Sequence, residues 1–357
     1  AFHSNKIQHY AHDLDDPAAL RAAIRWQAYT AIWSGKYAQA EVLARQSLAH
    51  GQEAGLPLHI SGGYQILSYS QIEAGKYREA YRNMRSIIDI EESADAYHHQ
   101  LARMRNQMGY LYLELGDAAE ALLWDRRAVE ASHNSPGITK FETQRYSLLN
   151  LATDYLHLNK IDEALDAIVQ FDAIKEVSFA VRFRYYNRYL LLMAELQLAQ
   201  NDFTKAIAFA REARDFGAQY KNLKNIARSH WLEGRGHLQM GKAREAKGHL
   251  EEAVQIADAI RHGSLRWKFR LDLAGAQIDA GESPTATIQE ARAMMEQTAD
   301  YLSGSHLQDS FLSSPWMSRI ESLEKTPAPK KATYPAGLTR REVEVLRLVA
   351  GGATNQQ

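Results

Sequence analysis

The sequence of 357 residues contains no cysteine, which excludes disulfides, thiolate metal sites and a cysteine nucleophile and fits a reducing cytosol. Long apolar runs are lacking too, since the longest, around Tyr189 to Ala199, falls short of the ~18–20 residues that a bilayer span needs. Neither positive nor negative charge dominates, because the chain has 42 Lys and Arg residues and 43 Asp and Glu residues. We therefore expect a cytoplasmic protein with no membrane span and no overall bias toward nucleic acid.

Catalytic signatures are also missing. There is no His-Glu-x-x-His, no Gly-x-Ser-x-Gly and no paired carboxylates with an obvious base partner. Gly-Lys pairs begin at Gly35, Gly75 and Gly241, but Tyr or Ala follows each pair where a phosphate-binding loop needs Ser or Thr. We expect no enzyme activity, no catalytic residue, no cofactor and no metal site in this chain.

What the sequence does contain is a repeat. Seven turn residues lie 40 to 43 positions apart: Gly35, Gly75, Gly116, Asn159, Asn201, Gly241 and Gly281. An alanine stands five positions after each of them: Ala40, Ala80, Ala121, Ala164, Ala206, Ala246 and Ala286. Helix-forming stretches of roughly 14 to 20 residues flank every turn, without strand patterns. The chain is therefore predicted to stack helical hairpins that share one continuous core and form a long curved binding surface.

A second constraint accompanies each turn. The residue seven positions earlier is always small: Ala28, Ser68, Gly109, Ala152, Ala194, Gly234 and Ala274. A small residue that faces an alanine lets two antiparallel helices approach to the short end of the usual ~8–10 Å. These positions are thus predicted to form the close contact inside each hairpin.

This pattern, with Tyr112 and Tyr155 four places before their turns, resembles the tetratricopeptide repeat. The resemblance implies an all-α fold, a right-handed superhelix of tetratricopeptide-like hairpins over residues 1–324. That repeat normally runs about 34 residues, so longer helices and inter-repeat loops must absorb the excess. HEAT and armadillo repeats have the right length, but they do not predict the constant turn-to-alanine spacing.

The composition changes after a last helix expected at roughly Gln308 to Leu323. Residues 325–337 hold three of the eight prolines and three lysines, a composition typical of an extended, solvated linker. In residues 338–357, Thr339 and Glu342 form a capping box, an apolar stripe follows, and a Gly-Gly pair ends the helix.

Residues 338–346 read Leu-Thr-Arg-Arg-Glu-Val-Glu-Val-Leu, and a Thr-Asn pair follows at Thr354. This segment resembles the opening of the LuxR-type helix-turn-helix. Repeats followed by this module are similar to the large ATP-dependent, MalT-like LuxR-type transcriptional regulators. The resemblance implies an ATPase domain upstream, a sensor function for the repeats, promoter DNA as a partner and a homo-oligomer in the full-length protein. We expect the sequence to be an excerpt that ends within the DNA-binding domain.

Thr354, Asn355 and Gln356 would begin the second helix of that module. Helix N-termini hold phosphates through free amide groups, so these residues are candidates for contact with the DNA backbone. Simple helix capping is the alternative, and the two roles are compatible.

The tetratricopeptide resemblance also predicts a ligand groove, because the first helix of each repeat lines the concave face. The candidate ligand residues are Arg103, Asn106, Tyr110, Tyr146, Asn150, Arg188, Arg228, Trp231, Arg235 and Lys268. Four of the five residues thirteen positions before the later turns are cationic, which suits a carboxylate, phosphate or acidic peptide. The alternative is a solvated helix face with internal ion pairs.

These patterns together indicate the signal-sensing region of a bacterial LuxR-type regulator. A small-molecule inducer or a protein or peptide partner would bind the groove and control DNA binding. The competing hypothesis is a tetratricopeptide-like interaction scaffold that binds a protein segment and no small molecule.

Overall fold

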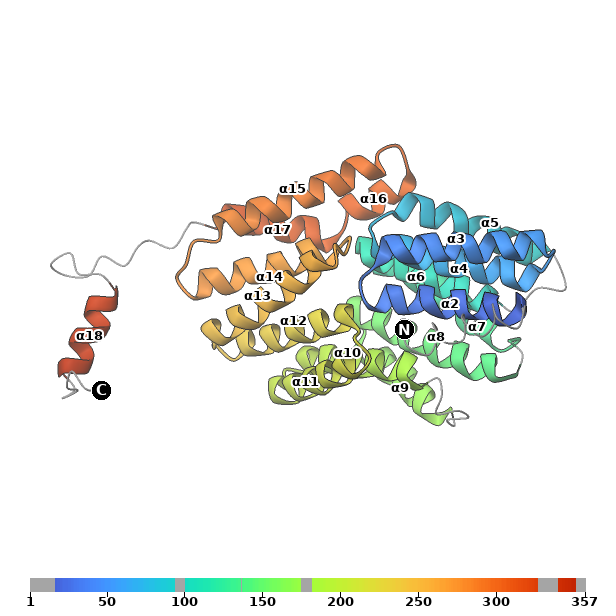
Figure 1. The fold of residues 1–357 in the computed structure, drawn as a ribbon. Coiled ribbons are helices and arrows are strands. Elements are labelled where there is room, and N and C mark those ends of the chain that lie inside the picture. The colour runs from blue at the N-terminus through green and yellow to red at the C-terminus, as the bar shows by residue number, and fades with distance from the viewer. Residues whose placement is uncertain (1–16, 94–99, 136, 175–181, 327–339, 351–357) are drawn as a thin grey trace.

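The computed structural model describes residues 17–93, 100–135, 137–174, 182–326 and 340–350, and all regular structure within them is helical. Seven antiparallel hairpins follow one another along the chain (Figure 1). They are α2 (Pro17–Trp33) with α3 (Tyr37–Glu53), α4 (Pro57–Glu73) with α5 (Tyr77–Ser93), α6 (Leu101–Leu115) with α7 (Ala118–Ser132), α8 (Gly137–His157) with α9 (Ile161–Ala173), α10 (Arg182–Ala199) with α11 (Phe203–Gln219), α12 (Leu223–Gln239) with α13 (Ala243–Ala259), and α14 (Leu265–Asp279) with α15 (Thr285–Leu302). The predicted all-α fold of tetratricopeptide-like hairpins is confirmed.

The seven predicted turn residues all adopt the left-handed conformation, with φ between 58° at Asn159 and 91° at Gly116. Glycine reaches this region without steric cost, and asparagine tolerates it better than other residues do. The next residue then bonds back to the helix that has just ended: the Asp117 amide donates to the Tyr112 carbonyl at 2.9 Å. This bond satisfies a helix-terminal carbonyl, so the turn residue ends one helix and starts the reversal.

The close contact within the hairpins is present where the sequence predicts it. All seven small residues before the turns are buried, as are six of the seven alanines after them. A Cβ added at Gly234 would lie only 2.7 Å from the Leu250 Cγ, so the helices leave no room for a larger residue there. The seventh alanine is the exception. Ala286 is exposed because α15 begins four residues after its turn instead of two, which moves Ile288 into the packed position.

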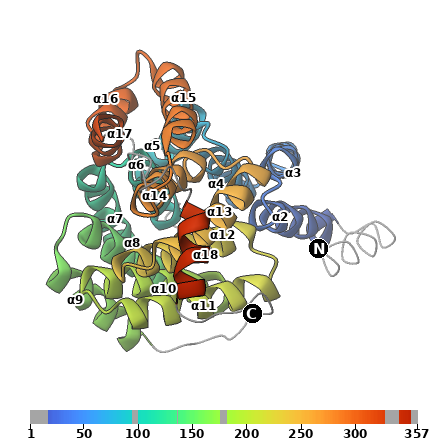
Figure 2. The same cartoon turned by 90° about the vertical axis from the view of Figure 1, so that its left-hand side faces the viewer.

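The array does not stay open. Ile72, Met84 and Met104 of the second and third hairpins share a core with Trp267 of α14 and with Phe311. The Gly263 amide donates to the Glu73 carbonyl at 2.8 Å, and these two residues are far apart in the sequence. Figures 1 and 2 both show α14 to α17 beside the early helices. The superhelix thus closes on itself and encloses an interior, where the sequence predicts only a curved surface.

The helix expected at roughly Gln308 to Leu323 is in fact two helices, α16 (His306–Leu312) and α17 (Pro315–Lys325). Pro315 occupies the first turn of α17, where its missing N–H costs nothing. These helices help to close the ring: the Ser310 hydroxyl donates to Asp117 at 2.7 Å, and the Trp316 ring packs 5.9 Å from the Trp267 ring.

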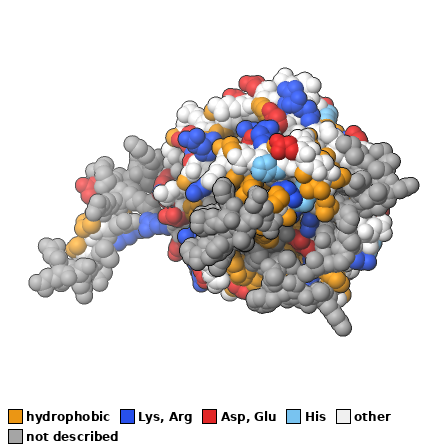
Figure 3. Space-filling model, turned by 45° about the vertical axis from the view of Figure 1, so that its right-hand side comes forward, with side chains coloured by type: hydrophobic (Ala, Val, Ile, Leu, Met, Phe, Trp, Pro, Cys, Tyr) orange, Lys and Arg blue, Asp and Glu red, His pale blue; other side chains and the backbone are white. Residues whose placement is uncertain are grey.

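Helix α18 (Arg340–Ala350) stands apart from the repeats in Figure 1. Its apolar side chains Val345, Leu346 and Val349 are exposed. Residues 327–337 of the predicted linker, residues 338 and 339 of the predicted helix-turn-helix segment, and the predicted DNA contacts Thr354, Asn355 and Gln356 lie outside the described residues. No helix in the described part combines the length and apolar character needed to cross a bilayer. The face drawn in Figure 3 mixes basic, acidic and apolar side chains, in line with the balanced composition.

The close alanine contact generates the first prediction. Ala206→Leu would force a larger side chain into a fully buried position between α10 and α11, and overpacking of this kind costs ~1–3 kcal/mol. Urea denaturation followed by circular dichroism should show that loss. The matched control is Ala286→Leu, which occupies the same repeat position but is exposed and should leave the free energy of unfolding nearly unchanged. Equal losses in the two variants would contradict the packing assignment.

Candidate functional site

A cavity of about 140 Å³ lies in the interior of the ring. The first helices of six consecutive hairpins line it, with side chains that include Tyr29 from α2, Tyr69 from α4, Tyr110 from α6, Tyr146 from α8, Arg188 from α10 and Lys224 from α12. This volume accommodates a group of about benzene size. First helices therefore face inward, as the tetratricopeptide resemblance implies.

Two further cavities continue the first. The second shares Tyr110, Arg188 and Arg228 with it and extends to Trp316. The third shares Trp231 and Trp316 with the second and lies against α17. The three form one channel along the interior, which we call the interior channel.

All ten predicted ligand residues line this channel. Arg103, Asn106, Tyr110, Tyr146, Asn150, Arg188 and Arg228 line the first cavity, Trp231 and Lys268 the second, and Arg235 the third. Their placement on one inner surface follows from the repeat period. Their role as ligand contacts stays a prediction.

Most of the cations in this set are already paired within the chain. Arg103 contacts Glu142 at 2.8 Å and Arg228 contacts Glu195 at 2.7 Å. Lys268 and Arg235 lie 3.4 and 3.8 Å from Glu114 and Asp272. Three of the acidic partners occupy the adjacent first helix, and Glu114 of α6 meets Lys268 of α14 across the closure of the ring, so the internal ion pairs weighed from the sequence account for these four cations. The expected ladder of free cationic donors does not form.

Arg188 differs from the other cations. It is half-buried, it lines both the first and the second cavity, and no described residue forms a hydrogen bond or an ion pair with it. The nearby carboxyl groups of Asp125 and Asp154 are buried, and burial raises the pKa of both. The positive charge of Arg188 acts against this rise of the two pKa values through its electrostatic field alone, without a hydrogen bond to either carboxyl group. A guanidinium in this position can donate hydrogen bonds from its N–H groups to an anion in the channel.

Carboxamides surround the first cavity. They belong to Gln65, Asn106, Gln107, Asn150, Asn222 and Asn225. The side-chain amide of Gln107 donates to the backbone carbonyl of Gln65 at 3.0 Å. The side-chain amide of Asn150 donates to the carboxylate of Asp125 at 2.9 Å. The carbonyl oxygens of these two carboxamides are buried and accept no hydrogen bond from the described residues. Both oxygens have almost no exposed surface, so they lie behind the cavity wall, while the carboxamide residues as a group give the wall a polar lining.

One edge of the channel is fixed by the buried carboxylate of Glu73, at the end of α4. Lys224 of α12 donates to it at 2.6 Å and Tyr110 at 3.0 Å, while the His262 ring lies 3.2 Å from its other oxygen. Burial alone would raise the pKa of Glu73, but Lys224 and His262 outweigh it and lower the pKa to about 2. This cluster, which we call the closing cluster, joins hairpins two and six across the ring.

Sequence analysis did not identify the closing cluster. Glu73 lies on the first helix of its repeat, the helix expected to line the concave face, but its partners Lys224 and His262 come from segments far along the chain. The signal that was available is a charged residue at an inward position of an early repeat. Pairing it with Lys224 requires the closure of the ring, which no local pattern predicts.

No protein-family model and no curated protein matches this sequence. Solved structures do match the fold. The structure of NprR in complex with its cognate peptide NprX is 12% identical, with 94% of this chain and 90% of that chain covered and a TM-score of 0.50. A Rap protein complexed with competence and sporulation factor is 13% identical over 85% of this chain and 98% of that chain, with a TM-score of 0.48. A tetratricopeptide repeat protein from Parabacteroides merdae is 14% identical over 82% and 99%, with a TM-score of 0.41. At such identities the NprR match supports the fold alone.

The closing cluster generates a stability prediction. Lys224→Met leaves the Glu73 carboxylate buried without its main cationic partner, which costs ~3–5 kcal/mol. Since the folded-state pKa of Glu73 is lowered from 4.5 to about 2, its contribution in the unmodified chain is complete above pH 4.5 and is lost as the pH falls toward 2. Chemical denaturation at pH 7 and across this acid range measures both effects.

The control for that experiment is Lys205→Met, which removes an exposed lysine that pairs with Asp202 at 2.7 Å and should barely change stability. Adding Glu73→Gln to Lys224→Met should recover part of the loss, because it removes the unpaired charge. A Lys224→Met chain as stable as the control would contradict the assigned role of the closing cluster.

Proposed function

We propose that this chain is the peptide-sensing region of a cytoplasmic LuxR-type transcriptional regulator. A short peptide binds in the interior channel and controls DNA binding by the C-terminal module. The observation that carries this proposal is the guanidinium of Arg188, which has no hydrogen-bond or ion-pair partner among the described residues and lines a cavity together with six carboxamide side chains.

The chemistry of the channel matches that of a peptide. The carboxamide side chains of the first cavity can exchange hydrogen bonds with a peptide backbone, and a carboxylate, from the C-terminus or an acidic side chain, binds the guanidinium of Arg188 through two hydrogen bonds. The tyrosines of the first cavity and Trp231 in the second supply apolar surface for side chains. The similar NprR structure holds its cognate peptide NprX, which supports this class of ligand.

The DNA-binding half of the proposal rests on the C-terminal segment. The LuxR-like motif predicts a helix there, and α18 begins at Arg340. Its exposed Val345, Leu346 and Val349 form a face that a helix-turn-helix packs against its following helices. Promoter DNA and a homo-oligomer of the full-length protein are the partners that this half of the proposal entails.

The closed ring supplies a mechanism. Helices α14 to α17 complete the ring against the early hairpins, and α17 is the last described helix before α18. A ligand that binds one arrangement of the ring better than another shifts the population toward it, by no more than its difference in affinity. The shift reaches the C-terminal module through the position of α17.

A permanent interaction scaffold remains the second candidate. It would be favoured by a broad groove that admits a folded partner segment, whereas the first cavity here has about 140 Å³ and is lined by the first helices of six hairpins. We therefore place a short peptide ahead of a scaffold partner and ahead of other small inducers.

The proposal predicts that Arg188 makes a large contribution to the affinity of the chain for its peptide ligand. Affinity selection from a library of short synthetic peptides should enrich a related set on the unmodified chain. Arg188→Ala should weaken the binding of those peptides about tenfold or more, because a charge-assisted contact is worth ~1.5–3 kcal/mol. Isothermal titration calorimetry measures the change. If the C-terminal carboxylate is the anion, amidation of the peptides should cause a similar loss.

Arg45→Ala serves as the control, since Arg45 is exposed on the outer helix α3 and pairs only with Glu41 at 3.6 Å among the described residues. Unchanged peptide affinity in Arg188→Ala, or selection of no peptide at all, would overturn the ligand assignment. The regulatory half is tested separately in the full-length protein, where a selected peptide should change promoter occupancy in a footprinting assay.

A further inference from the structure

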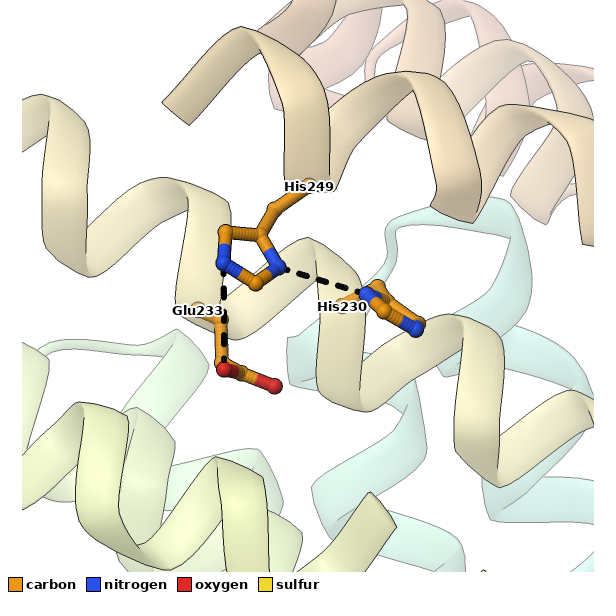
Figure 4. Close-up of side chains that lie close together, drawn as sticks. All are labelled: His230, Glu233 and His249. Carbon is orange, nitrogen blue, oxygen red and sulfur yellow. Dashed lines mark hydrogen bonds and ion pairs between the residues drawn. The ribbon is translucent and has the colours of Figure 1, made fainter. Parts of the chain in front are cut away.

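A cluster of imidazoles and one carboxylate lies between α12 and α13, outside the interior channel. His230, Glu233 and His237 stand at positions i, i+3 and i+7 of α12, and His249 comes from α13. The Nδ1 atoms of His230 and His249 are 3.3 Å apart, and the His249 Nε2 lies 3.9 Å from the Glu233 Oε2 (Figure 4). None of these residues lines the three cavities described above.

Their donor atoms are already gathered. One ligand atom each from His230, Glu233 and His249 lies within 4.8 Å of the other two. Ligand atoms around a tetrahedral zinc ion are roughly 3.3 Å apart, since each lies ~2.0–2.1 Å from the metal. The His230 to His249 distance already has this value, and side-chain rotation of the partly exposed imidazoles closes the rest.

Glu233 supplies the second, independent observation. Its side chain is 1% exposed, and Arg214 donates a hydrogen bond to the Oε1 atom at 2.5 Å. The Oε2 atom accepts no hydrogen bond from the described residues and faces His249. The buried Nδ1 of His237 also lacks a hydrogen-bond partner there, and its ring stacks on that of His249 with centroids 5.3 Å apart. The contacts of Oε2 with Arg211 and His249, at 3.7 and 3.9 Å, are longer than hydrogen bonds, so among the described residues this buried oxygen still lacks a close partner and can bind an added ligand.

The charges around the cluster permit a cation. Arg214 stays on the far oxygen of Glu233, and Arg211, 3.7 Å from Oε2, has a side chain that is 57% exposed and free to turn outward.

We propose that His230, Glu233 and His249 form a binding site for a zinc-class transition-metal dication. Two imidazoles and one carboxylate are a donor set that zinc favours, whereas magnesium and calcium prefer oxygen alone. The bound ion joins α12 to α13 and fixes the helix whose other face carries Arg228 and Trp231 into the channel. The site is independent of the peptide proposal.

The experiment titrates zinc into a tag-free chain that carries His3→Gln, His9→Gln and His12→Gln, which removes the histidines near the N-terminus as competing ligands. Calorimetry should show one high-affinity equivalent, and cobalt in its place should give the intense visible absorption of a tetrahedral site. In that background His249→Gln and, separately, His230→Gln should each weaken binding at least tenfold and abolish the cobalt spectrum.

The matched control is His133→Gln, because His133 is exposed at the end of α7 and contacts Gln144 only among the described residues. It should bind zinc as the background does. Circular dichroism checks that both cluster variants are folded, which the partly exposed positions of His230 and His249 favour. No high-affinity equivalent in the background chain, or equal binding in His249→Gln and the control, would overturn the proposal.

Discussion

The carboxylate of Glu73 holds the two ends of the repeat array together. A charge with no solvent exposure is tolerated only when its partners compensate for lost hydration, and these partners come from α6, from α12 and from the loop before α14. Three distant segments must therefore meet at one point. The closure of the superhelix into a ring depends on that meeting.

The channel that results is mostly balanced in charge. Basic side chains on one first helix are neutralised by acidic side chains on the next, as between Arg103 and Glu142, and such pairs rigidify the wall without attracting a ligand. Arg188 escapes this arrangement because the carboxyl groups near it, Asp125 and Asp154, are buried with raised pKa values and do not pair with it. Specificity for an anion is thereby concentrated at one position.

The local features of the fold could be predicted from the sequence because they repeat. Turn residues such as Gly116 and Asn159, and the small residues that face alanines, obey constraints within one hairpin, so spacing alone reveals them. The same period places the ten candidate ligand residues on the inner surface. The exposed Ala286 shows the limit of the method, since two additional loop residues after Gly281 move the helix out of register without disturbing the sequence pattern.

Closure of the ring could not be predicted in this way. It depends on contacts such as that between the Gly263 amide and the Glu73 carbonyl, which leave no periodic trace. The histidine cluster escaped for a related reason: three members follow helical spacing on α12, but His249 joins them only through packing of α13. Spacing in the sequence reveals residues that share a face of one helix, whereas a site shared between two helices is found only from the three-dimensional structure.

Closure also changes how such a chain must fold. An open solenoid can begin at any hairpin and add neighbours one at a time, and it tolerates the loss of a terminal unit. Here residues near position 70 are buried against residues beyond position 260, so the mean sequence separation of contacts, the contact order, is raised and the search for the native state is slowed. The second and third hairpins pack against α14 to α17, so we expect the array to unfold as one cooperative unit instead of as a string of independent modules.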